Sequence, residues 1–374
     1  MVNVESLNKR NNPNEQDPMK IKTLIPTLSC LVAVLNLLNA KDPFLGDWEG
    51  SFGDTPGAYR FHIKECYARV IPMGGEGYRV ILLPSLDERV PAHFDLMAKR
   101  NGDQLKFDDG EFRGVLENGE FEGAVIHDGE WVEFSLSKTQ RLSKTLNASP
   151  TGDAVVLFDG DDFDNWVPID ERLKEVPWKL TKDGAMEVVP RKSSKHPKTN
   201  LRTKQEFGDV YYHLEFKLPL EPENRAQGRA NSGVFIQKKY EVQVLDSYGL
   251  EGWWNECGSI YEIVSPAINR CAPPEQWQTY DIIFRTPRFD ENGVKVENAK
   301  LTVFHNGFQI HKDQEVPMTT IPQKYVSFSV EETDEPGFLW LQDHSNPVQF
   351  RNIWAVDLEN GGKIPEFVKA LGRY

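Results

Sequence analysis

Turn signals recur along the first half of the chain and constrain its fold more than any other feature. Asn-Gly or Asp-Gly pairs stand at 101–102, 109–110, 118–119 and 128–129, eight to ten residues apart. These pairs supply the positive φ angles that tight hairpins need. Evenly spaced hairpins predict a small antiparallel β meander or barrel over residues 41–146.

The second half of the chain alternates apolar and polar residues, the period expected of half-buried β-strands. The clearest examples are 210–218, 232–236, 240–244, 280–285 and 301–305. Long helical patterns are missing from the sequence, and only 365–371 could form a short helix. The chain is therefore predicted to be all-β, with the meander or barrel followed by a β-sandwich of the jelly-roll type over residues 155–374.

A small polar segment, residues 147–154, separates the two predicted parts. It contains Pro150 and Gly152, which favour a linker. We therefore expect that cleavage near Ser149 leaves residues 151–374 folded and able to bind sugar.

The N-terminal 40 residues have the layout of a polar leader followed by a secretory signal peptide. Basic residues 19–22 precede 18 uncharged residues, 23–40, which end in Leu38-Asn39-Ala40. This order is typical of export signals, so we expect a periplasmic or extracellular protein that starts near Lys41. The alternative is a membrane anchor, because the uncharged stretch approaches a spanning length. Pro26 weighs against the anchor, and we expect no stable membrane insertion.

The net charge and the cysteine content argue against some classes of binding partner and metal site. The net charge of −14 argues against nucleic acid, which needs a basic surface, and is compatible with a neutral carbohydrate. Cys66, Cys257 and Cys271 follow the signal peptide, without any Cys-x-x-Cys pair that would indicate structural zinc. Export permits disulfides, so Cys257 and Cys271 are predicted to be bonded. The alternative is two buried free thiols.

One face of the predicted sandwich gathers polar and aromatic side chains from three strands. Alternation sends Val242 and Val244 to the core, so Glu241 and Gln243 face the other way. The residues predicted to share that face are Asn231, Phe235, Gln237, Glu241, Gln243, Trp340, Gln342 and His344. Acids and amides bind sugar hydroxyls and aromatic rings stack on sugars. The pattern favours a carbohydrate site; an ordinary solvated sheet face is the alternative.

Short motifs in the second half resemble, in order, the 3-keto-disaccharide hydrolase domain family across residues 155–358. They are Val156-Leu157-Phe158-Asp159-Gly160, Trp166, Trp178, Asn231–Phe235, Tyr240–Asp246, Gly258–Tyr261, Trp277, Leu341–His344 and Phe350–Ile353. The resemblance implies a concanavalin A-like lectin/glucanase fold and action on oxidised glycosides. Two positions depart from it: Glu262 and Ser345 stand where the family usually has Gly.

The resemblance also implies a mechanism. Ordinary glycosidases use two carboxylates, whereas Gln243 follows Glu241 on the predicted face. A 3-keto sugar needs only one base and one acid, because its ketone acidifies the C2 proton. The base removes that proton, the aglycone leaves from C1 with help from the acid, and water adds back. Glu241 and His344 are the candidates for base and acid, in either order.

The remaining site residues have supporting roles. The predicted substrate-binding residues are Asn231, Gln243, Tyr261, Gln342 and Trp340. Asp246 or Asp343 could orient His344 or hold a divalent metal ion, and the sequence does not choose between them.

Other function classes stay open at this point. The same fold serves lectins, so a non-catalytic carbohydrate-binding module is the first alternative. A structural or adhesion role for an acidic exported chain is the second. Turnover of a 3-keto glycoside separates the enzyme from both.

Alternation also predicts how exposed two residues are. Glu241 should be surface-facing within a cleft, so Glu241→Gln should change stability by no more than roughly 0.5 kcal/mol. His213 should face out as well, away from every motif, so His213→Gln should be nearly silent.

Overall fold

The computed structural model describes residues 42–53, 64–191, 193 and 195–371. The predicted leader and signal peptide, residues 1–40, lie outside this part and stay a prediction. Within the described part, no helix combines the length and the apolar character that a membrane crossing requires.

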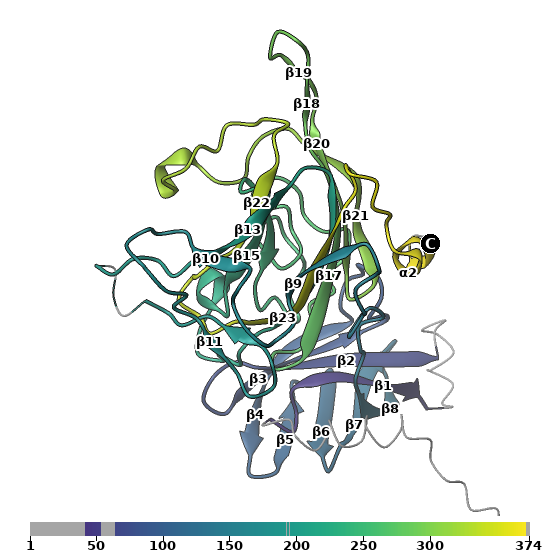
Figure 1. Cartoon of the computed structure of the whole chain (residues 1–374). Helices are drawn as coiled ribbons and strands as arrows, with labels where there is room; N and C mark the ends of the chain where they lie inside the picture. The colour runs from purple at the N-terminus through teal and green to yellow at the C-terminus, as the bar shows by residue number, and fades with distance from the viewer. Residues whose placement is uncertain (1–41, 54–63, 192, 194, 372–374) are drawn as a thin grey trace, which may run out of the picture. The chain divides into compact units, whose positions relative to one another are not determined.

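The first part of the described chain is a closed antiparallel barrel (Figure 1). Its strands, in order, are β1 (Gly46–Phe52), β2 (Glu65–Pro72), β3 (Gly77–Leu83), β4 (Phe94–Asn101), β5 (Gln104–Asp108), β6 (Phe112–Glu117), β7 (Glu120–His127) and β8 (Glu130–Thr139). The barrel closes because β1 pairs with both β2 and β8. The glycines of the predicted turns, including Gly102 and Gly129, have positive φ. The predicted hairpins and barrel are confirmed.

The second part is a sandwich of two sheets. One sheet, here called the site sheet, has the order β10 (Trp166–Pro168), β13 (Leu201–Phe207), β22 (Gly337–Leu341), β15 (Ser232–Ile236) and β16 (Tyr240–Val244). The other, the support sheet, has the order β11 (Lys179–Leu180), β12 (Met186–Glu187), β23 (Gln349–Asp357), β14 (Val210–Lys217), β17 (Trp277–Arg285), β20 (Ala299–His305) and β21 (Phe308–Val316), and β9 (Ala154–Phe158) also pairs with β23.

Two small elements complete the sandwich. The hairpin of β18 (Arg288–Phe289) and β19 (Lys295–Glu297) extends beyond the neighbouring strands, and α2 (Glu366–Leu371) lies near the C-terminus (Figure 1). The predicted all-β class, a barrel followed by a jelly-roll sandwich, is confirmed, as is the short C-terminal helix.

The core of the sandwich lies between the two sheets and follows the predicted alternation. The site sheet contributes Val234, Ile236, Val242, Val244, Leu339 and Leu341, and the support sheet contributes Tyr212, Leu214, Ile282, Phe284 and Val303. All of these side chains are buried. Each aliphatic side chain buried in this way contributes about 1.5–3 kcal/mol. The alternate residues of the site sheet are therefore free to form a site on its opposite face.

The outer face of the support sheet is covered rather than solvated. His213 on β14 is completely buried, its ring stacks on Trp354, and its Nδ1 lies 2.8 Å from Asp281 Oδ1. Burial opposes the charged imidazolium, but Asp281 and Glu215 outweigh it and raise the pKa of His213 to about 9. The expectation that His213 is exposed is wrong, because the chain beyond the barrel packs over this face: Thr145 donates a 2.6 Å hydrogen bond to Asp281.

The cysteines described by the structure are free thiols. Cys257 and Cys271 are both buried, and Cys257 Sγ lies 3.2 Å from the hydroxyl of Tyr280. This is the alternative that the sequence left open. Their bonding in the exported protein stays a prediction, as does the domain boundary at 147–154.

Candidate active site

A cavity of about 500 Å³ opens on the face of the site sheet that points away from the core. Every residue predicted to act on or bind the substrate lines it: Glu241, His344, Asn231, Gln243, Tyr261, Gln342 and Trp340. The strand register explains this convergence. On β15, Phe235 lies between Glu241 on β16 and Trp340 on β22, and its ring stacks on Trp340 with the centroids 3.7 Å apart.

Gly233 makes room for the carboxylate of Glu241. It pairs with Gln243 on β16, and its carbonyl accepts a hydrogen bond from the backbone N–H of Gln342, 3.1 Å away. A Cβ atom at this position would collide with Oε1 of Glu241 and with the ring of Phe235. The missing side chain therefore forms the hollow in which Glu241 sits.

The walls of the cavity are chain segments that form hydrogen bonds with the free backbone groups at the edge of the site sheet. β16 is the last strand of the site sheet, so one row of its backbone groups has no neighbouring strand. Segment 258–261 covers that row: the N–H of Tyr261 donates to the carbonyl of Glu241 at 3.1 Å, and the N–H of Gln243 donates to Ser259 at 3.0 Å. Thr320 Oγ1 accepts from the N–H of Glu241 at 2.8 Å. These contacts bring Tyr261 and segment 320–326 to the cavity.

Glu241 is buried by these walls, and only 6% of its surface is exposed. The expectation that it faces the surface is wrong for this reason. Burial, and then the charge of Glu262, raise the pKa of Glu241 to about 8, while Lys198 acts in the opposite direction. Glu241 therefore carries its proton at neutral pH.

His344 lies in an exposed turn just after β22. The carboxylate of Asp343 shapes this turn by accepting hydrogen bonds from the N–H groups of Ser345, at 2.8 Å, and Thr199, at 3.2 Å. Partial burial in the cavity wall, followed by the charge of Lys198, lowers the pKa of His344 below its usual range. Its imidazole is therefore neutral at neutral pH and able to accept a proton.

The two residues at which the sequence departs from the resemblance, Glu262 and Ser345, share one backbone conformation. Glu262 has φ 59° and Ser345 has φ 77°, both in the left-handed region. Glycine adopts this region without a steric penalty, whereas a residue with a Cβ does not. Both positions therefore have a backbone conformation that suits glycine, and the residues present are strained.

The amide groups of the site converge on Gln227, which the sequence analysis missed. Gln227 Oε1 accepts from Nδ2 of Asn231 at 3.1 Å and from Nε2 of Gln243 at 3.0 Å. Within the described residues, Oδ1 of Asn231 and Oε1 of Gln342 are buried without a hydrogen-bond partner. Buried acceptors of this kind require donors, and the hydroxyl groups of a sugar are donors.

Other lining residues missed by the sequence analysis are Lys198, Thr320 and Tyr325. Lys198 and Thr320 lie in irregular segments and Tyr325 ends the three-residue 3-10 helix Gln323–Tyr325, so no strand periodicity shows which way these side chains point. Lys198 is the cation that acts on both Glu241 and His344.

The two aspartates considered for a metal have other partners. Asp246 is buried, and its Oδ2 lies 2.6 Å from Nε of Arg229. Asp343 is occupied by backbone donors and orients the turn that carries His344. Neither lines the cavity. The described residues include no group of three or more His, Cys, Asp or Glu side chains that could hold a metal ion.

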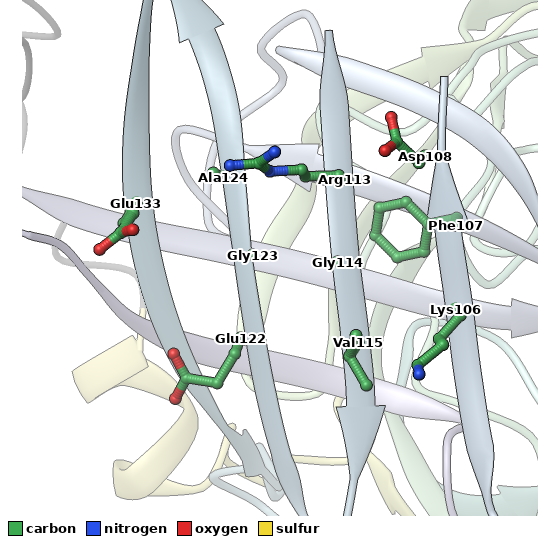
Figure 2. Close-up of a pocket in the computed structure, with 10 residues that line it drawn as sticks. All are labelled: Lys106, Phe107, Asp108, Arg113, Gly114, Val115, Glu122, Gly123, Ala124 and Glu133. Atoms are coloured by element: carbon green, nitrogen blue, oxygen red, sulfur yellow. The ribbon is translucent and has the colours of Figure 1, made fainter. Parts of the chain in front are cut away.

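A second concavity, of about 700 Å³, lies on strands β5 to β8 of the barrel. Gly114 and Gly123 face each other across β6 and β7 in its centre. Figure 2 shows charged side chains of both signs spread along neighbouring strands rather than directed at one point, among them Lys106, Arg113 and Glu122. This surface offers no arrangement for acid–base chemistry.

Comparison with known proteins assigns the sandwich to a family. The 3-keto-alpha-glucoside-1,2-lyase-like domain matches residues 153–356, more than half of the chain. The chain belongs to this family. The match begins at β9 and ends within β23, so it spans the sandwich and excludes the barrel. The resemblance stated from the sequence motifs is confirmed.

Solved structures of candidate glycosyl hydrolases from Parabacteroides distasonis ATCC 8503 are similar to this chain. One is 34% identical, with 55% of this chain and 84% of that chain covered and a TM-score of 0.48. Two others are each 19% identical, with TM-scores of 0.39 and 0.37; they cover 55% and 54% of this chain and 93% and 98% of their own. No curated protein matches the chain. The family model thus identifies residues 153–356 as a 3-keto-alpha-glucoside-1,2-lyase-like domain.

Proposed function

We propose that this cavity cleaves the glycosidic bond of 3-keto glycosides, with His344 as the general base and Glu241 as the general acid. The proposal rests on one pairing. Glu241 is a buried carboxyl group that keeps its proton at neutral pH, and His344 is an imidazole in the same cavity that does not. An elimination needs this combination of one loaded acid and one free base.

The steps balance with water as the one further reactant. The imidazole of His344 takes the C2 proton, and the electrons of the C2–H bond move to the ketone oxygen, giving an enolate. The enolate collapses to form a C1–C2 double bond as the C1–O bond breaks, and Glu241 gives its proton to the departing oxygen. Lys198 lines the cavity and supplies a positive charge for the enolate oxygen. Water then adds to the double bond: ionised Glu241 takes a proton from the water as its oxygen bonds to C1, and the imidazolium of His344 returns a proton to C2, which gives the hydrated sugar and restores both groups.

The polar lining of the cavity supports a sugar substrate. The orphaned acceptors of Asn231 and Gln342 are suited to sugar hydroxyls, and the stacked Phe235 and Trp340 rings form an apolar floor. A non-catalytic carbohydrate-binding module would share this lining but would not need the protonated Glu241.

The test is release of the aglycone from a 3-keto-α-glucoside and from the same glucoside without the ketone. We expect release from the oxidised compound alone, with an unsaturated sugar or its hydrate as the product in mass spectrometry. Equal release from the unoxidised glucoside would contradict the proposed mechanism. Binding without release would select the carbohydrate-binding module.

Variants test the two roles. Glu241→Gln and His344→Gln should each lower the rate by about 10²–10⁴. His127→Gln, in the barrel, is the matched control, and its rate should equal that of the wild type. A near-normal rate for either cavity variant would remove that residue from the mechanism. The rate should rise with pH as His344 loses its proton and fall again as Glu241 loses its own near pH 8.

A further inference from the structure

Glu262 stands in a turn whose backbone geometry is fixed by hydrogen bonds. Ile260 and Val264 exchange both of their backbone hydrogen bonds at 3.0 Å, which closes the chain around Glu262. The N–H of Glu262 itself donates to the carbonyl of Trp254 at 3.0 Å. On the other side, Ile260 pairs with Val242 of β16. The position of residue 262 beside β16 is therefore set by the backbone and not by its side chain.

The fold gives no reason for glutamate at this position. At φ 59° a residue with a Cβ atom is strained, whereas glycine would form the same turn freely. Backbone strain of this kind clusters at functional sites. The side chain of Glu262 is exposed, so burial of apolar surface does not offset the free energy of the strain either.

The side chain does have a partner in the cavity. Glu262 and Glu241 line the same cavity, and the charge of Glu262 is second only to burial in raising the pKa of Glu241. The other titratable groups that line the cavity are Lys198, Tyr261, Lys324, Tyr325 and His344. Of these, Lys198 acts on Glu241 in the opposite sense to Glu262.

We propose that Glu262 is a positioning residue for the acid of this site: its strained backbone holds a carboxylate at the cavity wall, and that charge keeps Glu241 loaded with its proton. The inference rests on the proposed function, in which Glu241 must donate a proton. Glu262 touches no reacting atom in this role. It sets the pH range over which the acid is ready.

The test compares Glu262→Gly, Glu262→Gln and Glu262→Asp with the wild type. Loss of the negative charge makes it easier for Glu241 to ionise, so the alkaline limb of the pH–rate profile should move to lower pH by about half a unit to one unit in the Gly and Gln variants. Glu262→Asp keeps the charge and should keep the limb near its wild-type position. Glu262→Gly should also raise the melting temperature by about 2–4 °C, because it removes the strain.

Glu275 provides a matched control. It is a glutamate with φ 66°, and it lies outside the cavity. Glu275→Gly should leave the pH–rate profile unchanged. Coincident alkaline limbs for the wild type, Glu262→Gly and Glu262→Gln would overturn the proposal. A rate that falls equally at every pH would also overturn it, because that result would place Glu262 in contact with substrate.

A second readout does not depend on turnover. Carbon-13 NMR of labelled glutamate side chains can follow Glu241, whose signal is identified by its loss in Glu241→Gln. Its titration should move to lower pH in Glu262→Gln. If it moves while no 3-keto glycoside is cleaved, the proposed function fails and the coupling of the two carboxylates stands. If it does not move, the coupling fails whatever the activity.

Discussion

Replacement of Glu241 by Gln should change the pH dependence of stability. In the unfolded chain this carboxyl group has an ordinary pKa of 4.5, whereas in the folded protein burial and the charge of Glu262 raise it to about 8. Between these two values the folded protein holds a proton that the unfolded chain has released. Stability therefore falls as the pH rises through this window. In Glu241→Gln the side-chain amide is uncharged in both the folded and the unfolded protein, so it cannot contribute to the fall in stability.

The size of the effect follows from the shift. Each pKa unit corresponds to about 1.4 kcal/mol, so between about pH 5 and about pH 8 the Glu241 carboxyl removes roughly 3 kcal/mol of stability from the wild type. The stability of Glu241→Gln relative to the wild type should rise by that amount over the same range. This replaces the expectation of a nearly silent substitution, which assumed an exposed side chain.

Urea unfolding of the wild type and of Glu241→Gln, followed by tryptophan fluorescence at about pH 5 and about pH 8, measures the difference in their free energies of unfolding. The dependence of that free energy on urea concentration should be the same for both proteins, which shows that they unfold by a common reaction. Other titrating groups are shared by the two proteins and cancel in the comparison. Glu133→Gln, at an exposed position on the barrel, is the control and should follow the wild type at both pH values. A difference between Glu241→Gln and wild type that is the same at both pH values would refute the reasoning, because Glu241 would then titrate alike in the folded and unfolded states.

Three further predictions concern the site and the chain around it. Gly233→Ala should abolish most of the activity, because it fills the hollow beside Glu241. Gly152→Ala is the control and should keep the activity, because an added Cβ there meets nothing within 4 Å. Activity assays on both variants test whether the hollow is needed. N-terminal sequencing of exported protein should find a start near Lys41, and retention of residues 23–40 would contradict the predicted signal peptide. Residues 151–374 expressed alone should give a β-type circular dichroism spectrum and bind sugar, because the cavity and the family match both lie there; an unfolded product would show that the barrel is integral to the fold.

Alternation along strands was sufficient to predict which side chains of the site sheet enter the site. Because Val242 and Val244 are buried in the core, Glu241 and Gln243 must face the other way, and the structure has them there. The alternation of apolar and polar residues shows on which side of the sheet a side chain lies, but it does not show which segments cover that side. His213 and Glu241 both face away from the core, and both are buried by segments that a strand pattern does not register. Lys198 and Gln227 were missed for the same reason, since Lys198 lies in irregular chain and Gln227 in the three-residue 3-10 helix Ala226–Gly228.

The covering of β16 links the stability of the sheet to the chemistry of the site. An edge strand must satisfy its free backbone groups, and Tyr261 and Thr320 do so by binding the carbonyl and the N–H of Glu241. The same two segments remove water from the side chain of Glu241. Desolvation favours the neutral form of a carboxyl group, so the contacts that protect the edge also keep the acid protonated. Glu262 follows Tyr261 directly, so its charge is brought to the acid by the same segment. If Glu241 is the acid of the proposed reaction, a change that loosens the edge should therefore alter the pH range of that reaction before it unfolds the sandwich.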